Sequence, residues 1–260
     1  MNAPDINPIA IQFGPIAIHW YALSYLAAFG MAWWLGNRLA DRPGSPFNRE
    51  QVADIIFYGA LGILLGGRIG YILFYKPVYY FEHPLEMFFL WRGGMSFHGG
   101  MLGTVFALWL YTRHLKMQLL TVTDFIGPLV PLGLGFGRIA NFINQELWGR
   151  VTDVPWAMVF RTGGPMPRHP SQLYEAFLEG AVLFAILWWT AKKSRPTGMI
   201  TGIGITGYGM FRMFVEFFRQ PDAHLGYLAF GWLTMGHLLS LPMVLFGLGL
   251  VYWSTRRNRN

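Results

Sequence analysis

Apolar residues fall into seven blocks along this chain, and shorter segments that hold most of the charged residues separate them. A helix needs ~20 mostly apolar residues to cross a bilayer core of about 30 Å, and most of the blocks reach that length. The pattern predicts an all-α, polytopic membrane protein with about seven transmembrane helices, in which residues 1–260 form a single domain. The predicted spans are Ile16–Gly36, Val52–Phe74, Phe97–Thr112, Val122–Ile143, Leu173–Ala191, Gly198–Phe218 and Leu233–Trp253.

Three segments depart from this regular pattern. The span at Phe97–Thr112 is short and follows a glycine-rich approach, so its first turn is predicted to be irregular. Irregular backbone is tolerated at this depth when it is buried in protein or lines a wet cavity. The apolar run Pro84–Trp91 is too short to cross and is predicted to lie in the membrane interface. Residues 144–172 are predicted to form a short periplasmic segment.

The distribution of lysine and arginine predicts the orientation, because cytoplasmic loops carry an excess of these residues. With seven spans, eleven basic residues fall on the side of the C-terminus and six on the other side, where they are spread over longer loops. The N-terminus is therefore predicted to be periplasmic and the C-terminus cytoplasmic. No basic stretch precedes the first apolar block, so that block is interpreted as a retained span and not as a cleaved signal peptide. The eleven are Arg38, Arg42, Arg49, Arg113, Lys116, Lys192, Lys193, Arg195, Arg256, Arg257 and Arg259; the six are Lys76, Arg92, Arg150, Arg161, Arg168 and Arg219.

Composition excludes several other classes of protein. Apolar residues make up 53% of the chain. Charged residues make up only 13%, about half of the ~25% that is usual in soluble domains, so the composition argues against a water-soluble globular protein. The absence of cysteine excludes disulfides, thiolate metal sites and a cysteine nucleophile from this chain. The net charge of +7 is attributed to basic cytoplasmic loops that face anionic lipid, and not to nucleic-acid binding.

Three arginines, Arg68, Arg138 and Arg212, lie inside the predicted spans or at their ends. An arginine at mid-membrane costs about 2.5–3.5 kcal/mol on insertion scales, so each of them needs a partner or a function. A purely structural alternative is that each guanidinium reaches the headgroup region on its apolar stem. For Arg68, pairing with Asp54 is a further structural alternative.

Arg138 and Arg212 each come with polar neighbours at helical spacing. Arg212 and Glu216 are i, i+4 partners, and Arg219 follows three residues later. Such a pair can be only a neutralised structural bridge, but a guanidinium fork also matches a phosphate in charge and in bidentate geometry. The neighbours of Arg138 are Asn141 and Gln145 at i+3 and i+7, with Asn144 and Glu146 beside them.

Glycines and aromatic residues frame the other candidate groups. His98 stands between two glycine pairs, whose backbone N–H groups favour a concavity for an anion, and a histidine can accept a proton at neutral pH. A hydrogen-bonded structural histidine is the alternative. The aromatic set at residues 19–21 is typical of a membrane-interface belt. The spacing of Gly62, Gly66 and Gly70, and of Gly133 and Gly137, predicts close helix packing.

Several of these segments resemble, in the same order, those of bacterial phosphatidylglycerol–prolipoprotein diacylglyceryl transferases. The longest is residues 137–149, GRIANFINQELWG. The others are residues 19–21 (HWY), 98–100 (HGG), 168–175 (RHPSQLYE), 209–212 (GMFR) and 216–222 (EFFRQPD). The resemblance covers almost the whole chain, although the segment 150–168 is shorter than in many members.

The resemblance implies a seven-helix enzyme of the bacterial inner membrane whose active site faces the periplasm. It implies transfer of diacylglycerol from phosphatidylglycerol to the lipobox cysteine of a preprolipoprotein, with release of glycerol phosphate, in the first step of lipoprotein maturation. His98, Arg138 and Arg212 match critical positions of the family. The positions implied to support substrate binding are Tyr21, Asn141, Glu146, Gly149, Glu216 and Arg219, to which we add Arg68 as the third arginine within a span.

These residues suggest a mechanism that needs no metal or cofactor. Arg138 and Arg212 would clamp the phosphate, and His98 would take the proton of the substrate thiol, which is mostly protonated at neutral pH. Glu216 and Glu146 would orient the arginines or the glycerol head. Tyr21 and Asn141 would add hydrogen bonds.

Two other classes of function remain as alternatives. An ion-coupled secondary transporter of a small anionic solute also has glycine-broken spans with intramembrane arginine and histidine, but the chain shows no duplicated halves. An intramembrane aspartyl peptidase would use Asp54 and Asp124. Both aspartates lie at the predicted cytoplasmic ends of their spans, where a capping role is simpler.

Overall fold

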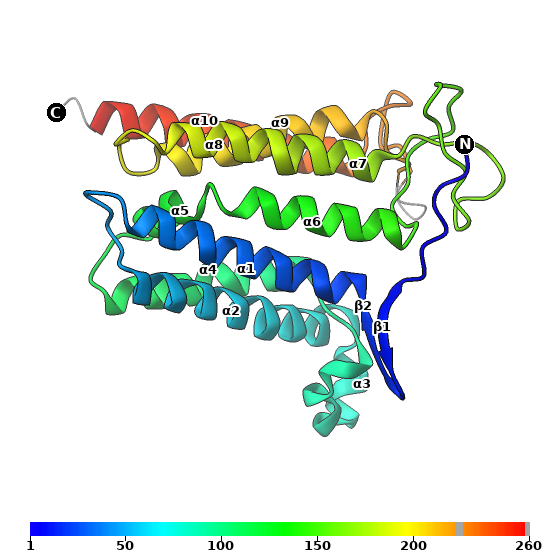
Figure 1. Ribbon diagram of the computed structural model, residues 1–260, viewed down its shortest axis with the longest axis horizontal. Coiled ribbons are helices and arrows are strands. Elements are labelled where there is room, and N and C mark those ends of the chain that lie inside the picture. Colours follow the sequence, from blue (N-terminus) through cyan, green and yellow to red (C-terminus); the bar gives the residue numbers. More distant parts are fainter. Residues whose placement is uncertain (222–225, 258–260) are drawn as a thin grey trace. The chain divides into compact units, whose positions relative to one another are not determined.

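The structure is a computed structural model that describes residues 1–221 and 226–257, with its elements labelled in Figure 1. Asp222 and Arg259, which the sequence analysis used, lie outside the described residues. The chain divides into two compact units, Met1–Leu35 with Thr123–Asn260, and Gly36–Val122. The helices are α1 (Trp20–Ala40), α2 (Arg49–Tyr75), α3 (Pro77–Glu82), α4 (Phe97–His114), α5 (Leu119–Ile126), α6 (Val130–Ile143), α7 (Ser171–Glu175), α8 (Leu183–Thr190), α9 (Met199–Glu216) and α10 (Met235–Arg257). Two 3-10 turns, η1 (Pro84–Phe88) and η2 (Leu90–Arg92), a π-helical stretch η3 (Ala176–Val182), and strands β1 (Ile9–Phe13) and β2 (Ile16–His19) complete the described elements.

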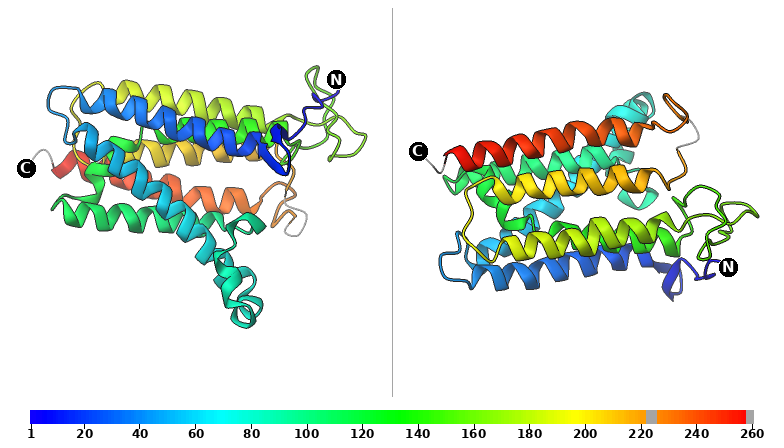
Figure 2. Two further views of the ribbon diagram at one scale, coloured as in Figure 1. Left: turned by 60° about the horizontal axis from the view of Figure 1, so that its bottom comes forward. Right: turned by 90° about the horizontal axis from the view of Figure 1, so that it is seen from above.

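Within the described residues, three helices are long and apolar enough to cross a membrane. They are α2, α10 and the segment Ser171–Thr190, in which α7, η3 and α8 form one continuous helix (Figure 2). The pair α5 and α6 adds a fourth if it is counted as one bent span. This helical, multi-pass character agrees with the predicted class of protein.

The first predicted span begins later than its apolar block. Residues 16–19 do not join the helix, because they form β2, which pairs antiparallel with β1 through Phe13 and Ile16. Gly14, at a φ of +55°, makes the tight turn between the strands, in a conformation that glycine adopts at little cost. The helix α1 therefore starts at Trp20.

The predicted span Val122–Ile143 is broken in the structure. The helices α5 and α6 meet at an angle of 53° across residues 127–129. Pro128 lies in the break and Pro131 in the first turn of α6, and a proline has no backbone N–H to continue a helical ladder. The prediction of an uninterrupted helix was wrong at this point.

In the unit Gly36–Val122, α2 packs against α4 through the glycines that the sequence spacing singled out. A Cβ atom on Gly62 would lie 2.7 Å from the Cα of Thr104, and one on Gly70 would lie 2.8 Å from the Cα of Gly99. No side chain fits between backbones at this separation. The prediction of close helix packing is therefore confirmed for Gly62, Gly66 and Gly70.

Replacing Gly66 by alanine is expected to destabilise this helix pair by about 1–3 kcal/mol, the usual cost of overpacking. The added Cβ would lie 2.7 Å from the Cα of Gly103, so the two backbones would have to separate. Gly59 of the same helix is the matched control, because a Cβ there meets no atom within 4 Å. Thermal unfolding in detergent measures the effect, and equal midpoints for Gly66→Ala and Gly59→Ala would contradict it.

Candidate functional site

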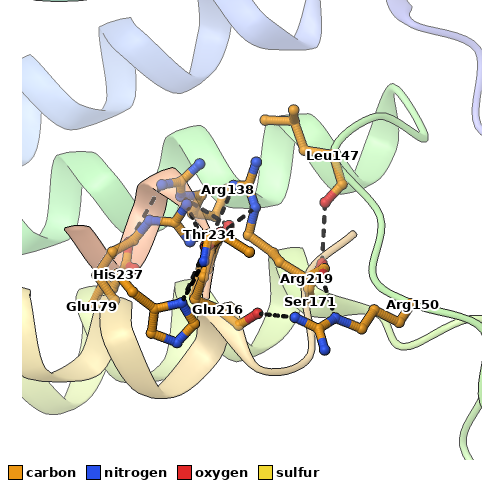
Figure 3. A network of polar contacts seen from close by, with 11 residues as sticks. Arg138, Leu147, Arg150, Ser171, Glu179, Glu216, Arg219, Thr234 and His237 are labelled. Carbon is orange, nitrogen blue, oxygen red and sulfur yellow. Dashed lines mark hydrogen bonds and ion pairs between the residues drawn. The ribbon is translucent and has the colours of Figure 1, made fainter. Parts of the chain in front are cut away.

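In the larger unit, two helices end and a third begins beside a cluster of charged side chains. Arg138 lies near the end of α6, and Arg212 and Glu216 lie in the last turns of α9. Glu175 closes α7, and Glu179 follows one turn later in η3. Figure 3 shows this network from close by. The structure thus brings Arg138 and Arg212, which are 74 residues apart in the numbering of the chain, to one place.

Glu175 is the centre of this cluster, because three arginines contact its carboxylate. The Nε of Arg138 lies 3.2 Å from Oε2, and the guanidinium groups of Arg212 and Arg219 lie 3.0 and 3.1 Å from Oε1. The Glu175 side chain is fully buried. A buried charge is tolerated only when it is paired, and here each oxygen meets at least one cation.

Two more carboxylates complete the charge balance. Oε2 of Glu216 lies 2.8 Å from Arg212 and 3.9 Å from Arg219. Glu179 makes a longer contact of 3.4 Å with Arg138. Three arginines and three glutamates therefore form one cluster whose formal charges cancel.

The carboxylates and the guanidinium groups differ in exposure. The side chains of Glu175 and Glu179 are 0% exposed and that of Glu216 is 6% exposed. The arginines retain 18% exposure at Arg138 and 15% at Arg212. The carboxylates are therefore buried more deeply than the arginine side chains. An anionic ligand would meet guanidinium groups that the carboxylates already orient.

The remaining polar residues after Arg138 have other partners. Asn141 is buried and donates to Glu146 at 2.8 Å, so Glu146 contacts an amide and not an arginine. Because α6 ends at Ile143 and Gln145 has a φ of +56°, Gln145 does not continue the face of Arg138. It accepts from the Arg161 backbone N–H at 2.7 Å instead. The prediction that Gln145 shares a helix face with Arg138 was therefore wrong, because the helix ends before Gln145.

The loop between α6 and α7 packs against the end of α9. The N–H of Gly149 donates to His169, and a Cβ on Gly149 would lie 2.5 Å from the carbonyl oxygen of Phe218, so only glycine fits there. Arg150 donates to the carbonyl oxygens of Arg219 at 2.8 Å and Glu216 at 3.1 Å. This loop thereby fixes the backbone that carries two members of the cluster.

The surroundings of His169 in the same loop favour the neutral form of its imidazole. Burial, and to a smaller degree the positive charge of Arg150, lowers the pKa of its imidazole below the usual 6.5. Its Nδ1 lies 3.1 Å from the Tyr174 hydroxyl. Its ring also packs edge-on against that of Phe218, with the ring centres 5.2 Å apart.

His98 and Tyr21 each lie in the first turn of a helix. His98 is exposed in the first turn of α4, which begins regularly at Phe97 with Ser96 as its cap, while the irregular backbone lies just before it at Gly93 and Gly94. His98 belongs to the unit Gly36–Val122. Tyr21 lies in the first turn of α1, and its ring packs against Tyr25 at 5.4 Å.

Arg68 does not pair with Asp54, so that structural alternative was wrong. Asp54 accepts from the Tyr111 hydroxyl at 3.0 Å. The guanidinium of Arg68 is buried, and among the described residues it donates to backbone carbonyls, which belong to Met87, Gly93, Gly94, Glu86 and Phe89. These carbonyls lie in and after the 3-10 turns η1 and η2. Arg68 therefore anchors by hydrogen bonds the segment Pro84–Trp91, which was predicted to lie in the membrane interface.

Sequence reasoning missed Glu175 and Glu179 as members of the site. The three arginines within the predicted spans stood out as charges in apolar blocks, whereas these two acids were not predicted to take part. The signal was present, since two glutamates four residues apart in an apolar block need cationic partners as much as an arginine needs an anionic one. Asp124, in contrast, has the capping role: its carboxylate accepts from the backbone N–H groups of Gly198 and Thr201 at the start of α9.

The fold and this cluster define a class of protein: a multi-pass helical membrane protein with preoriented arginines at the ends of its helices. Comparison with known proteins identifies the family. The family model described as prolipoprotein diacylglyceryl transferase matches residues 8–253, and the chain belongs to this family. No group of three or more histidine, cysteine, aspartate or glutamate side chains suited to a metal ion occurs among the described residues.

Three curated relatives carry the name phosphatidylglycerol–prolipoprotein diacylglyceryl transferase. The protein from Aliivibrio fischeri is 55% identical over 259 residues, which cover 99% of this chain and 93% of the relative. The protein from Nitratidesulfovibrio vulgaris is 56% identical over 256 residues, covering 98% and 95%. The protein from Photobacterium profundum is 56% identical over 255 residues, again covering 98% and 95%.

Proposed function

We propose that this chain transfers the diacylglyceryl group of phosphatidylglycerol to the thiol of the lipobox cysteine of preprolipoproteins. The transfer forms a thioether and releases glycerol phosphate. The observation that carries the proposal is the sharing of Glu175 by Arg138 and Arg212, which places two guanidinium groups side by side at 3.2 and 3.0 Å from one carboxylate. The family match supports the same reaction and does not favour a transporter.

The chemistry needs cations at the phosphate. The substrate sulfur attacks the glycerol methylene carbon, a carbon–sulfur bond forms, and the carbon–oxygen bond to phosphate breaks with its electron pair leaving on oxygen. The phosphodiester thereby becomes a monoester and gains negative charge. Guanidinium groups fixed in advance stabilise this developing charge more than they stabilise the starting lipid, and this difference accelerates the reaction.

Each predicted residue has a role in this proposal. Arg138 and Arg212 bind the phosphate, while Glu175 and Glu216 hold the two guanidinium groups in place. His98 takes the thiol proton. Supporting contacts to substrate or to the site are assigned to Tyr21, Asn141, Glu146, Gly149 and Arg219, and the contacts of Arg68 favour a scaffolding role for it.

The proposed setting is the bacterial inner membrane. We assign seven spans to a single transmembrane domain, with a periplasmic N-terminus, a cytoplasmic C-terminus and a periplasmic segment at about residues 144–172. The excess of basic residues on the side of the C-terminus supports this orientation. It places the ends of α6 and α9, and therefore the arginine cluster, on the periplasmic side.

The test is a direct assay of transfer. We expect the purified chain, incubated with phosphatidylglycerol and a lipobox peptide, to add the mass of one diacylglyceryl group to the peptide cysteine. A peptide with serine in place of the cysteine controls for non-specific modification and should remain unmodified. Failure to modify the cysteine peptide would refute the proposed activity, and flux of an anionic solute into liposomes without modified product would favour the transporter.

A further inference from the structure

Glu216 has a set of contacts on the side away from the arginines. Its Oε1 accepts from the Thr234 hydroxyl at 2.7 Å, and the same hydroxyl lies 3.0 Å from Nδ1 of His237. Thr234 directly precedes α10 and His237 lies in its first turn. Figure 3 labels these three side chains, and dashed lines mark the contacts between them.

The single proton of the hydroxyl determines how these groups bond. An ionised carboxylate only accepts, so the 2.7 Å contact uses the threonine proton. The 3.0 Å contact must then run from Nδ1–H of His237 to the threonine oxygen. The backbone N–H of Thr234 lies 3.4 Å from Nδ1, but it can donate to that nitrogen only in the tautomer whose proton is on Nε2. With the proton on Nδ1, the closer of the two contacts is satisfied and the hydrogen bonds run from His237 through Thr234 to Glu216.

The surroundings hold the side chains of Thr234, His237 and Glu216 in place. As whole residues, Thr234, His237 and Glu216 are 2, 3 and 4% exposed. The imidazole packs against the rings of Phe217 and Trp232, with ring centres 4.7 and 5.5 Å apart. Nε2 of His237 has no hydrogen-bond partner among the described residues. A Cβ on Gly236 would lie 2.5 Å from the Glu216 carboxyl carbon, so the first turn of α10 presses directly against this carboxylate.

We propose that Thr234 and His237 are positioning residues that hold Glu216 and, through it, set the direction of the Arg212 guanidinium. This inference rests on the proposed function. With Oε1 committed to Thr234, Oε2 is the oxygen that faces Arg212 at 2.8 Å. Loss of the hydroxyl lets the carboxylate rotate, and Arg212 then loses its fixed orientation toward the phosphate. The last span thus contributes to a site whose charged members all lie on other elements.

The test compares side chains that keep or lose each donor, in the full-length chain with phosphatidylglycerol and a lipobox peptide. Thr234→Val keeps the shape without the hydroxyl and is expected to lower kcat/KM at least tenfold, whereas Thr234→Ser keeps the hydroxyl and should stay within about twofold of the unmodified chain. His237→Gln, whose amide still donates, should retain more activity than His237→Phe. Gly236→Ala, which displaces Glu216 without touching the threonine, should resemble Thr234→Val.

Ser254→Ala is the matched control, because Ser254 is a buried hydroxyl of the same helix whose bond to Pro196 lies at the other end of α10. It should leave kcat/KM unchanged. Thermal unfolding identifies variants that fail to fold. If Thr234→Val is one of them, the kcat/KM values of the His237 and Gly236 variants test the inference. Normal kcat/KM in Thr234→Val, or equal losses in Thr234→Ser and Thr234→Val, would overturn the inference while the transferase activity stands. Absence of product from the unmodified chain would instead refute the proposed function and this inference with it.

Discussion

Replacing Glu175 by glutamine is expected to abolish most of the transferase activity and to destabilise the chain. Glutamine has the same shape but removes the negative charge that three arginines share at 3.0–3.2 Å. One carboxylate oxygen becomes an amide that points a donor at a guanidinium. Removing one partner of a buried ion pair typically costs about 3–5 kcal/mol, because the other charge stays buried without compensation. Thermal unfolding and the rate of peptide modification measure the two effects.

Glu179→Gln is the comparison that isolates the shared contact. Glu179 is equally buried and lies one helical turn later, but in the described part of the chain its carboxylate has one ion-pair contact, of 3.4 Å, with Arg138. Its loss should therefore cost less activity and less stability than the loss of Glu175. If the two variants were impaired to the same degree, burial of any acid in this helix, and not the sharing by three arginines, would explain the result.

Changing Arg138 or Arg212 to lysine is expected to lower the rate of transfer by about 10²–10³-fold, the usual cost of removing one preorganised donor from a transition-state site. Lysine keeps the positive charge but loses the planar fork that can bond to a carboxylate on one side and to a phosphate on the other. Because each of these guanidinium groups contacts two carboxylates, lysine cannot reproduce both contacts from a single nitrogen.

Arg49→Lys is the control for this pair of variants. Arg49 also makes a bidentate contact with a carboxylate, that of Asp41, but both side chains are exposed, at 70 and 47%. Exposed ion pairs contribute little, so this variant should retain full activity. Wild-type rates in both Arg138→Lys and Arg212→Lys would rule out the proposed phosphate clamp.

Much of the fold follows from local features of the sequence. The apolar blocks predict the position of α2, α4, α9 and α10 within a few residues, because each helix must be apolar along its whole length to lie in lipid. The spacing of Gly62, Gly66 and Gly70 predicts the close approach of α2 and α4. The hairpin before Trp20 and the break near Pro128 were missed, since apolar content alone does not separate a strand from a helix or a bent span from a straight one.

The candidate site, like the fold, could be predicted from the sequence only in part. The pair Arg212 and Glu216 could be predicted because its members are neighbours on one helix face, and their 2.8 Å contact is present. Arg138 stood out as a charge inside an apolar block. Its partners Glu175 and Glu179 are 37 and 41 residues further along, and no local pattern connects residues at that distance.

The sequence by itself determined that this chain is a membrane protein, which family it resembles and which arginines need an explanation, because the cost of a charge in lipid depends on the residue type and on its apolar neighbours. Only the tertiary structure decided which partners meet those charges. It placed Glu175 under three guanidinium groups, gave Arg68 a set of carbonyls in place of Asp54, and brought Thr234 to Glu216. An ion pair or hydrogen bond requires a separation of about 3 Å, and the ends of packed helices supply that separation between residues that are far apart in the chain.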